Sequence, residues 1–289
     1  WSNASGSTFS ISGLSPGTSY NIKIKVRRAD SGLYTTSNNI SFTTKSIARI
    51  SNSSLSMNIG GSLSLSFSNY GNNKSFLRFY AQKTDGNWQQ IATVSNIQAS
   101  SYSWNLSSYS STLYSLCPNS NSLKIKVICG VSLNGREYTN TVSGSAKVTN
   151  SNPAFSNFTF QNTDSKTVSI VGNAQNMFSL FGNLRITITS ANKAVARNSA
   201  TMKYYNIVVS SGNTVVSKKS NYSLSDINVD IGSLQSAGTY TIRIDAVDSR
   251  GNASGVVSKT LVVYPYHTPA ISASIDRLNG FEAETSLKL

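Results

Sequence analysis

The segment GLSPGTSYNIKIKV, residues 13–26, restricts the fold of this chain more than any other part of the sequence. Pro16 fixes φ at a turn, and Gly17 tolerates the backbone conformation that follows. From residue 20 to residue 27, apolar residues then alternate with polar ones. A period of two places the apolar side chains on one face of a β-strand and the polar side chains on the other. The segment therefore predicts a strand that is buried on one face only.

The tyrosine between the turn and the strand indicates which kind of sheet this strand joins. In Greek-key β-sandwiches, a tyrosine at this position forms a tyrosine corner, in which its hydroxyl bonds to the backbone upstream. The simpler alternative is an ordinary strand that begins with a tyrosine. The same order of residues returns at GTYTIRIDAV, where Tyr240 precedes Ile242 and Ile244. We therefore assign structural roles to Tyr20 and Tyr240 and predict a sandwich around each.

The chain repeats the series of core strand, glycine-containing hairpin tip and final strand about every 100 residues, the size of an immunoglobulin-like sandwich. Hydrophobic residues are 38% and charged residues 12% of the sequence, a composition that fits packed sheets rather than disorder. We therefore predict an all-β fold of tandem immunoglobulin-like β-sandwiches. The predicted modules are a partial sandwich at 1–45, a sandwich at 46–149, a second at 150–264, and a linker with the start of a further β module at 265–289.

Local signals place individual elements within these modules. Asp-Gly at 85–86 and Asn-Gly at 134–135 predict hairpin turns. Pro153 and the stretch 265–269, which begins and ends with proline, are expected to stiffen the joints between modules. Further strands are expected at residues 9–11, which include Phe9 and Ile11, at residues 168–171 and at residues 184–189.

The first residue lies within a domain pattern, so we expect an internal segment of a longer protein. No apolar run approaches the roughly 18 residues that a membrane span requires, and we expect no membrane span.

Two tryptophans admit two interpretations. Trp88 opens the strand after the turn at 85–86, a position where core tryptophans of sandwiches often lie, and large aromatic side chains dominate core burial. If they were exposed, Trp88 and Trp104 would instead offer flat surfaces on which sugars stack. We favour the core and assign Trp88 a structural role.

Few residues suggest catalysis or metal binding. His267 is the only histidine and lies in a linker, so we expect neither a histidine-based triad nor a histidine metal cluster. Asp245 and Asp248 are better explained as turn formers and partners of arginines than as a calcium site or a catalytic carboxylate pair. Cys117 and Cys129 are close in sequence for a sandwich disulfide, so we expect two thiols. We therefore expect no enzyme activity, cofactor or metal.

Basic residues outnumber acidic ones by 25 to 11, for a net charge of +14, which favours polyanionic partners. The basic residues are spread singly along strands rather than clustered on one element, which argues against nucleic acid as the partner. On the outward faces of the repeated core strands they suggest a positive strip that binds an anionic polymer. The alternative is a solvated face that prevents edge-to-edge pairing. The candidate ligand-binding residues are Lys23, Lys25, Arg27, Lys124, Lys126 and Arg243.

Two segments resemble known families. Residues 1–44 resemble the end of a fibronectin type III domain, through GLSPGTSY and the alternation after it. Residues 150–264 resemble minor structural proteins of long-tailed phages that infect Gram-positive bacteria. The matching landmarks are Asn152-Pro153 with Phe155, Phe158 and Phe160, and the segments LRITITSANKAVARNSATMKYY and AGTYTIRIDAVDSRGNAS. The resemblance implies a virion tail or tail-tip protein built from immunoglobulin/fibronectin III-like sandwiches, and it carries no catalytic residues.

We therefore expect a tail protein of the virion whose sandwich modules extend the tail and contribute to attachment at the host cell surface. The expected partners are other tail proteins, an anionic wall polymer or saccharide of the host, and further copies of the full-length protein in a homo-oligomer. One alternative is a bacterial cell-surface adhesin or stalk, and another is a non-catalytic accessory region of a cell-wall hydrolase. The fold alone does not distinguish these roles.

Overall fold

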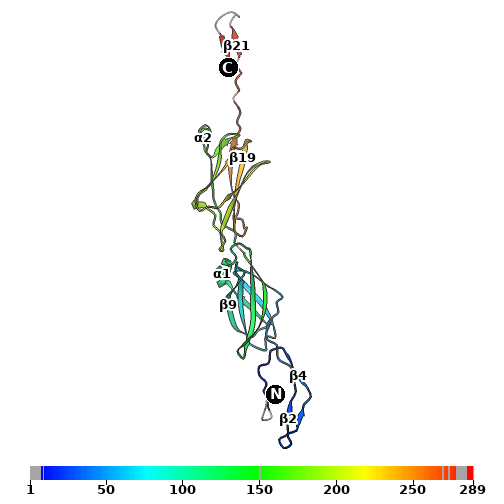
Figure 1. The fold of residues 1–289 in the computed structure, drawn as a ribbon. Coiled ribbons are helices and arrows are strands. Elements are labelled where there is room, and N and C mark those ends of the chain that lie inside the picture. Colours follow the sequence, from blue (N-terminus) through cyan, green and yellow to red (C-terminus); the bar gives the residue numbers. More distant parts are fainter. Residues whose placement is uncertain are drawn as a thin grey trace. The chain divides into compact units, whose positions relative to one another are not determined.

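The computed structural model describes residues 8, 10–149, 151–268, 270–272, 274–277 and 285–288. The chain divides into two compact units (Figure 1). The first contains the chain up to Ser151 together with Arg197–Thr201, and the second contains Asn152–Ala196 and Met202–Leu289. Strands make up nearly all of the regular structure, and each unit contains a sandwich of two sheets. The prediction of an all-β chain of tandem immunoglobulin/fibronectin III-like sandwiches is therefore confirmed.

The first sandwich packs a three-stranded sheet against a five-stranded sheet. Its elements are β5 (Arg49–Ile50), β6 (Leu55–Asn58), β7 (Ser62–Ser68), β8 (Ser75–Gln82), β9 (Trp88–Ile97), β10 (Ser101–Asn105), the short helices η1 (Ser107–Tyr109) and α1 (Ser110–Ser115), β11 (Ser122–Leu133) and β12 (Arg136–Lys147). The sheet orders are β10-β7-β5 and β6-β12-β11-β8-β9. The β11–β12 hairpin turns at Asn134 and Gly135, whose φ angles are 51° and 75°, as a type I′ turn requires.

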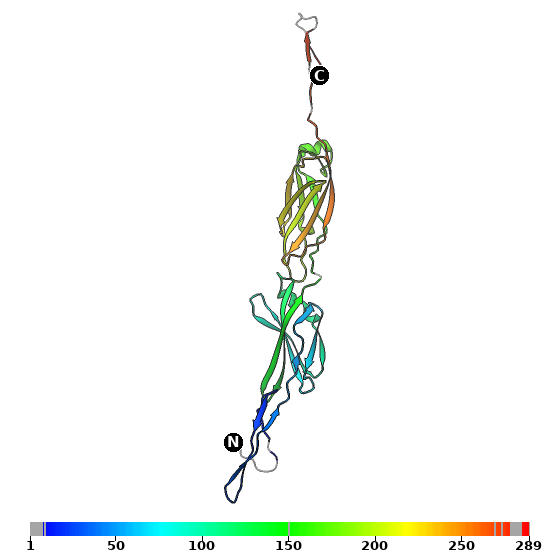
Figure 2. The same ribbon diagram turned by 90° about the vertical axis from the view of Figure 1, so that its right-hand side faces the viewer.

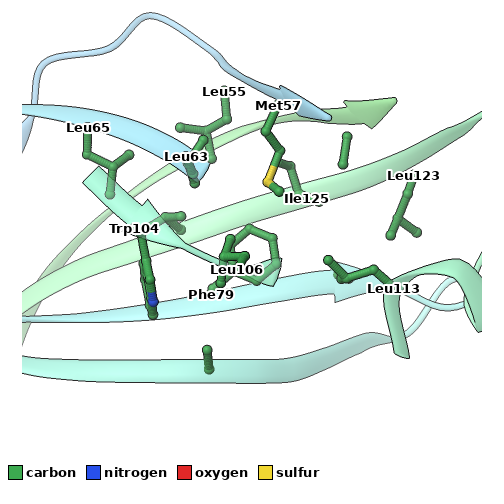
Figure 3. Packing of buried hydrophobic residues seen from close by; sticks show 14 of the residues in the cluster. Leu55, Met57, Leu63, Leu65, Phe79, Trp104, Leu106, Leu113, Leu123 and Ile125 are labelled. Carbon is green, nitrogen blue, oxygen red and sulfur yellow. The ribbon is translucent and has the colours of Figure 1, made fainter. Parts of the chain in front are cut away.

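Apolar side chains from both sheets fill the space between them, as the alternation predicts. Ile125 of β11 is fully buried, and Trp104 of β10 is 6% exposed. The Trp104 ring packs edge-on against Phe79, with the ring centroids 6.1 Å apart. Leu113 of α1 is buried in the same core (Figure 3). The core of this sandwich is therefore complete within the unit.

The second sandwich has the same strand order as the first. Its elements are β13 (Thr159–Asn162), α2 (Ser165–Val171), β14 (Asn176–Phe178), β15 (Leu184–Ile188), η2 (Ser190–Asn192), β16 (Met202–Ser211), β17 (Thr214–Asn221), β18 (Ile227–Gly232), β19 (Gly238–Asp248) and β20 (Val257–Tyr264). The sheet orders are β13-β15-β18 and β14-β20-β19-β16-β17. In Figure 2 the strands of this sandwich are coloured from green to orange. In both sandwiches one short edge strand runs parallel to the last strand, β6 beside β12 and β14 beside β20.

Tyr240 at the start of β19 shows the geometry of a tyrosine corner. Its side chain is fully buried, and its hydroxyl donates a hydrogen bond to the carbonyl oxygen of Ser236, 3.1 Å away. A corner of this kind ties the loop before the central strand to the strand itself. It therefore fixes the point at which the chain enters the core.

A hairpin of short strands precedes the first sandwich. Its strands are β1 (Ser19–Ile22), β2 (Lys25–Arg27), β3 (Tyr34–Thr36) and β4 (Ile40–Thr43), paired as β1 with β4 and β2 with β3. The hydroxyl of Tyr20 accepts a hydrogen bond from the backbone N–H of Ser15 at 2.8 Å. On the apolar face, Ile24 and Val26 are 52% and 60% exposed. In the described part of the chain, this hairpin has no second sheet over its apolar face.

The prediction of a strand at residues 168–171 is wrong, because this segment belongs to helix α2. The Asp164 side chain accepts a hydrogen bond from the N–H of Thr167 at 2.8 Å and caps the first turn. Gly172 ends the helix with a φ of 74°, the left-handed conformation that glycine adopts readily. The two caps outweigh the β-branched residues between them, which favour a strand.

The remaining expectations concern the ends of the chain. Phe9 and Pro269 lie outside the described residues, and Ile11 belongs to no strand, so the strand expected there is not observed at Ile11. Near the C-terminus, β21 (Ser274–Arg277) pairs antiparallel with β22 (Thr285–Lys288). This pair lies in the segment where we predict the start of a further β module.

Gly144 of β12 lies against the backbone of β6, and this close approach gives a first prediction. A Cβ atom on Gly144 would lie 1.9 Å from the carbonyl oxygen of Leu55, its partner in the parallel register. We expect Gly144→Ala to force the two strands apart and to lower the free energy of unfolding of this sandwich by about 1–3 kcal/mol. Urea unfolding followed by tryptophan fluorescence measures the change, since Trp88 and Trp104 both belong to this unit.

The matched control is Ser143→Ala, at the exposed neighbouring position on the same strand. We expect this variant to change the free energy of unfolding by less than about 0.5 kcal/mol. Equal losses in the two variants would show that the contact with β6 does not require glycine.

Candidate functional site

The outward side of the five-stranded sheet in the first sandwich brings together polar and aromatic residues from three neighbouring strands. Tyr80 of β8 lies between Gln90 of β9 and Lys126 of β11 in the strand register. Paired residues project from the same side of a sheet, so these three side chains share the side opposite to the core. This surface is termed the first outer face and consists of Phe76, Arg78, Tyr80, Gln82, Trp88, Gln90, Lys124 and Lys126.

Lys126 is held over two aromatic rings of the first outer face. Its Nζ lies 4.4 Å from the centroid of the Trp88 ring and 5.2 Å from that of the Tyr80 ring. The Tyr80 hydroxyl and Gln90 Oε1 form a hydrogen bond of 2.8 Å, in which the hydroxyl donates. An ammonium over a ring is stabilised by about 0.5–1 kcal/mol at an exposed site. The rings therefore restrict the position of the ammonium, which lowers the entropic cost of pairing it with an anion.

The prediction that Trp88 belongs to the core is wrong, because Trp88 is half-buried on the outer face. The register of the β8–β9 hairpin explains this position. Ala81, which is fully buried, pairs with Gln89, whereas Trp88 pairs with the outward-pointing Gln82. Among the tryptophans that the structure describes, the one in the core is Trp104. The sequence shows where the turn lies. It does not show which residues pair across the turn, and this pairing decides on which side of the sheet each side chain lies.

Arg78 and Glu137 form an ion pair on the same side of the sheet. The Arg78 guanidinium donates two hydrogen bonds to the Glu137 carboxylate, 2.6 Å and 2.9 Å long, and lies 4.2 Å from the centroid of the Phe76 ring. These hydrogen bonds lower the pKa of Glu137 and raise the pKa of Arg78. Glu137 thus neutralises Arg78, and the net positive charge of the first outer face comes from Lys124 and Lys126.

Lys124 lies at the rim of a shallow pocket of about 240 Å³ next to the first outer face. Lys83 also lines this pocket and forms an exposed ion pair with Asp85 at 3.4 Å. Buried Cys117 and Leu123 contribute apolar lining. The polar lining comes from Gln82, Thr84, Asn119, Ser120 and Ser122. The pocket therefore combines positive charge, hydrogen-bonding groups and an apolar floor.

The second sandwich also has a cation over a ring on the outward side of its five-stranded sheet, although the lysine lies on the edge strand rather than on the central one. Lys219 of β17 lies with its Nζ 4.0 Å from the centroid of the ring of Tyr204 on β16. Asn206 lies between Lys219 and Asp245 in the register, and its amide donates a hydrogen bond of 2.9 Å to Asp245 Oδ2. Lys219, Asn206 and Asp245 line an open hollow of about 510 Å³. Arg243, a predicted binding residue, is exposed on the neighbouring strand β19.

The first hairpin carries a third group of this kind. The Nζ of Lys25 lies 4.0 Å from the centroid of the Tyr34 ring, and the Cζ of Arg27 lies 5.8 Å from it. Arg27 and Tyr34 are partners in the β2–β3 register, and Lys23 is exposed in the link between β1 and β2. The predicted binding residues therefore fall into three groups, one in the first hairpin and one in each sandwich.

The aspartate and the cysteines considered in the sequence analysis have structural roles. Asp248 is fully buried, and its Oδ1 accepts hydrogen bonds from the backbone N–H groups of Arg250 and Asn252, at 2.9 Å and 2.8 Å, so it forms the turn as expected. Cys117 and Cys129 are buried thiols with no disulfide, as predicted, and burial raises the pKa of Cys129. Among the described residues, no cluster of three or more His, Cys, Asp or Glu side chains is arranged to hold a metal ion.

No helix in the described part of the chain has both the length and the apolar character needed to cross a membrane.

The strand order of the two-sheet units defines a modular β-sandwich protein of the immunoglobulin/fibronectin III-like class. Residues 29–286 match a family described as a siphovirus protein of unknown function (DUF859). Because the match covers most of the chain, the protein belongs to this siphovirus family. Membership indicates a structural protein associated with a phage particle and its other proteins, which confirms the phage part of the sequence-based resemblance. No curated protein matches the chain.

Several solved structures of fibronectin type III domains are similar to this chain. Fibronectin(III)-like modules of CbhA from Clostridium thermocellum are 15% identical, with 78% of this chain and 100% of that chain covered and a TM-score of 0.28. A two-domain fibronectin type III segment of chicken tenascin is 12% identical, with 75% and 97% covered and a TM-score of 0.34. The FN1–FN3 domains of chicken CNTN1 are 11% identical, with 86% and 77% covered and a TM-score of 0.27. These similarities concern the fold alone.

The Arg78–Glu137 pair predicts how the stability of the first sandwich depends on pH. The pKa of Glu137 is lowered from its ordinary value of 4.5 by the hydrogen bonds from Arg78. The folded state therefore binds this proton less readily than the unfolded state, and the stabilising contribution is fully present above the ordinary pKa and is lost as the pH falls through the lowered one. We expect the urea midpoint of the native protein to decrease over this pH range, and to decrease less in Glu137→Gln.

Asp30→Asn, which removes an exposed carboxylate of the first hairpin, is the control and should retain the pH dependence of the native protein. If Glu137→Gln lost stability with falling pH as steeply as the native protein does, the ion pair would not be the source of the effect.

Proposed function

We propose that this siphovirus protein is a structural component of the phage tail, and that its sandwich modules serve as spacers whose outward faces bind an anionic polymer or saccharide of the host cell wall. The observation that carries the proposal is a cation held over an aromatic ring on an outward sheet face, repeated in three modules. The repeated pairs are Lys25 with Tyr34, Lys126 with Trp88, and Lys219 with Tyr204.

Folding does not require these pairs, since both sandwich cores are complete without them. Each pair offers an ammonium that can form charge-assisted hydrogen bonds with a phosphate or carboxylate. The aromatic ring beside it offers an apolar surface on which the C–H groups of a sugar can pack. A phosphate-containing glycopolymer presents both chemistries in one repeating unit, and the net charge of +14 favours its approach.

Each pair is a weak site, so attachment by this protein depends on several sites acting together. Linked sites bind a repetitive polymer far more tightly than one site does, because the second contact is intramolecular. In this proposal the protein acts by binding and spacing rather than by catalysis. Several copies in a homo-oligomer, beside other tail proteins, would multiply the number of contacts further.

The two alternative roles use the same modules in another setting. A bacterial surface adhesin or stalk would present the faces from the host side, and an accessory region of a cell-wall hydrolase would use them to hold a catalytic domain at its substrate. Membership of a siphovirus family favours the virion over the bacterial surface.

Labelling of purified virions tests the location. We expect an antibody against the second sandwich to bind the tail in immunogold electron micrographs. Labelling of the capsid alone, or of the host surface without virions, would contradict a tail position.

Binding of the purified chain to intact Gram-positive host cells, with and without wall teichoic acid, tests the ligand class. We expect saturable binding that is lost with the polymer. Lys126→Gln should weaken this binding about fivefold at low salt, corresponding to about 1 kcal/mol for one anion contact. High salt should suppress the effect of Lys126→Gln, because the ionic contribution is screened. Trp88→Ala should weaken binding at low and at high salt alike, because the contact of the ring with the sugar is not ionic.

Lys74→Gln provides the matched control, since Lys74 is exposed in the loop before β8 and its loss changes the net charge equally. Binding that fell equally in Lys74→Gln and Lys126→Gln would reflect net charge rather than a site. Absence of saturable binding at either salt concentration would remove the attachment role and leave that of a spacer.

A further inference from the structure

Asp245 of β19 lines the open hollow on the outward side of the second sandwich, and its carboxylate forms no ion pair with any described residue. Its hydrogen bond comes from the side-chain amide of Asn206, which donates to Oδ2. Within the described part of the chain, Oδ1 has no donor. The arginine partner that the sequence suggested for Asp245 is therefore not observed, and the hollow contains a carboxylate with an acceptor oxygen that the fold does not use.

Asp245 differs in this respect from the other carboxylate side chains that the structure describes. Ion pairs hold Asp30, Asp85, Glu137 and Asp230. Backbone N–H groups donate hydrogen bonds to Asp164, Asp226 and Asp248. Each of those carboxylates neutralises a cation or fixes a turn or a helix end. Asp245 has neither role, so its negative charge is available to a ligand.

Two cations flank Asp245 on the same side of the sheet. Lys219 lies two strands away in the register, with Asn206 between them, and neighbouring strands are about 4.8 Å apart. Arg243 lies two residues before Asp245 on β19, so it projects from the same side, and it is exposed. Among the described residues, neither Lys219 nor Arg243 forms an ion pair; the Lys219 ammonium lies over the ring of Tyr204 instead. The face therefore presents a negative charge between two positive ones.

We propose that this hollow binds a phosphate-containing polymer whose repeating units also carry primary amines, with an ammonium of the ligand at Asp245 and its phosphates at Lys219 and Arg243. The inference rests on the proposed function, because it names the kind of polymer that the second sandwich holds. Asp245 would repel a ligand with anionic groups alone, and a neutral sugar would leave all three charges without a counter-charge. An amine between phosphates complements the face in sign at each position. The volume of about 510 Å³ lies within the range of small-ligand sites.

The first outer face lacks this feature and serves as an internal reference. It contains no carboxylate, and the neighbouring Glu137 is already paired with Arg78. Its net positive charge comes from Lys124 and Lys126. We therefore expect the first outer face to bind phosphate whether or not an amine accompanies it, whereas the hollow of the second sandwich favours the phosphate that carries an amine.

NMR titration of the isotope-labelled chain with two small probes tests the assignment. O-phosphoethanolamine carries a phosphate and an amine, and glycerol phosphate carries a phosphate and hydroxyl groups. The side-chain amide signals of Asn206 and Gln90 report the hollow and the first outer face separately. We expect the Asn206 signal to respond to O-phosphoethanolamine at about fivefold lower concentration than to glycerol phosphate, as is usual for one exposed ion pair. The Gln90 signal should show no preference for the amine.

Asp245→Asn should change the two affinities in opposite directions at the Asn206 signal. It should weaken O-phosphoethanolamine about fivefold, because the ion pair is lost, and strengthen glycerol phosphate, because the repulsion is lost. The new side chain keeps an oxygen that can accept the hydrogen bond from Asn206. Lys219→Gln should weaken both probes, because it removes a cation that holds the phosphate.

The matched control is Asp226→Asn, which changes the net charge equally within the same unit. Asp226 is exposed in the loop before β18, which belongs to the other sheet, and this variant should keep the preference for the amine. Equal responses of Asn206 to the two probes, or equal weakening of both in Asp245→Asn, would overturn recognition of an amine and leave anion binding intact. A response at Gln90 with none at Asn206 would overturn the assignment of the hollow alone. Absence of a response at both amides would also count against the proposed function.

Discussion

Burial of one face of each central strand is the interaction on which the rest of the structure depends. β11 and β19 lie within their five-stranded sheets and pair with a neighbour on each side. Ile125 and Ile242, on the inner side of these strands, are fully buried. In a strand with period-two alternation, the residues that are buried determine which residues point outward. Because Ile125 is buried, Lys126 must lie on the outward face. The core and the candidate binding face are thus two consequences of the same packing.

The fold follows from the sequence wherever burial and turn chemistry agree. The Asn134-Gly135 turn, the buried Trp104 and the free cysteines were all predicted. The failures arise from pairing between residues far apart in the sequence and, at residues 168–171, from local helix caps that oppose the strand preference. The side on which Trp88 lies depends on pairing across a hairpin, and α2 exists because its caps outweigh the preference of valine and isoleucine for strands. The exposed apolar side of the first hairpin also depends on what lies opposite it, which alternation within one strand does not reveal.

The candidate site was predictable only in part, for the same physical reason. Alternation identifies Lys126 as outward. Its ring partners lie on β8 and β9, which are far from Lys126 in the sequence. Lys219 was not predicted because Lys218 stands beside it, and two adjacent lysines conceal which of them points outward. The sequence of one strand is therefore enough to predict an outward cation. Predicting a cation–ring pair also requires the register between two strands.

The parallel pairing of β6 with β12 and of β14 with β20 has a mechanical consequence. Tension along the chain reaches a sandwich through its early strands and leaves through its last strand. Pulling the start of β6 and the end of β12 in opposite directions slides two parallel strands along each other. Their backbone hydrogen bonds are then loaded together rather than broken one after another, as they would be if the strands were peeled apart. In both units, the short edge strand thus resists extension of the chain, because its hydrogen bonds to the last strand must break together.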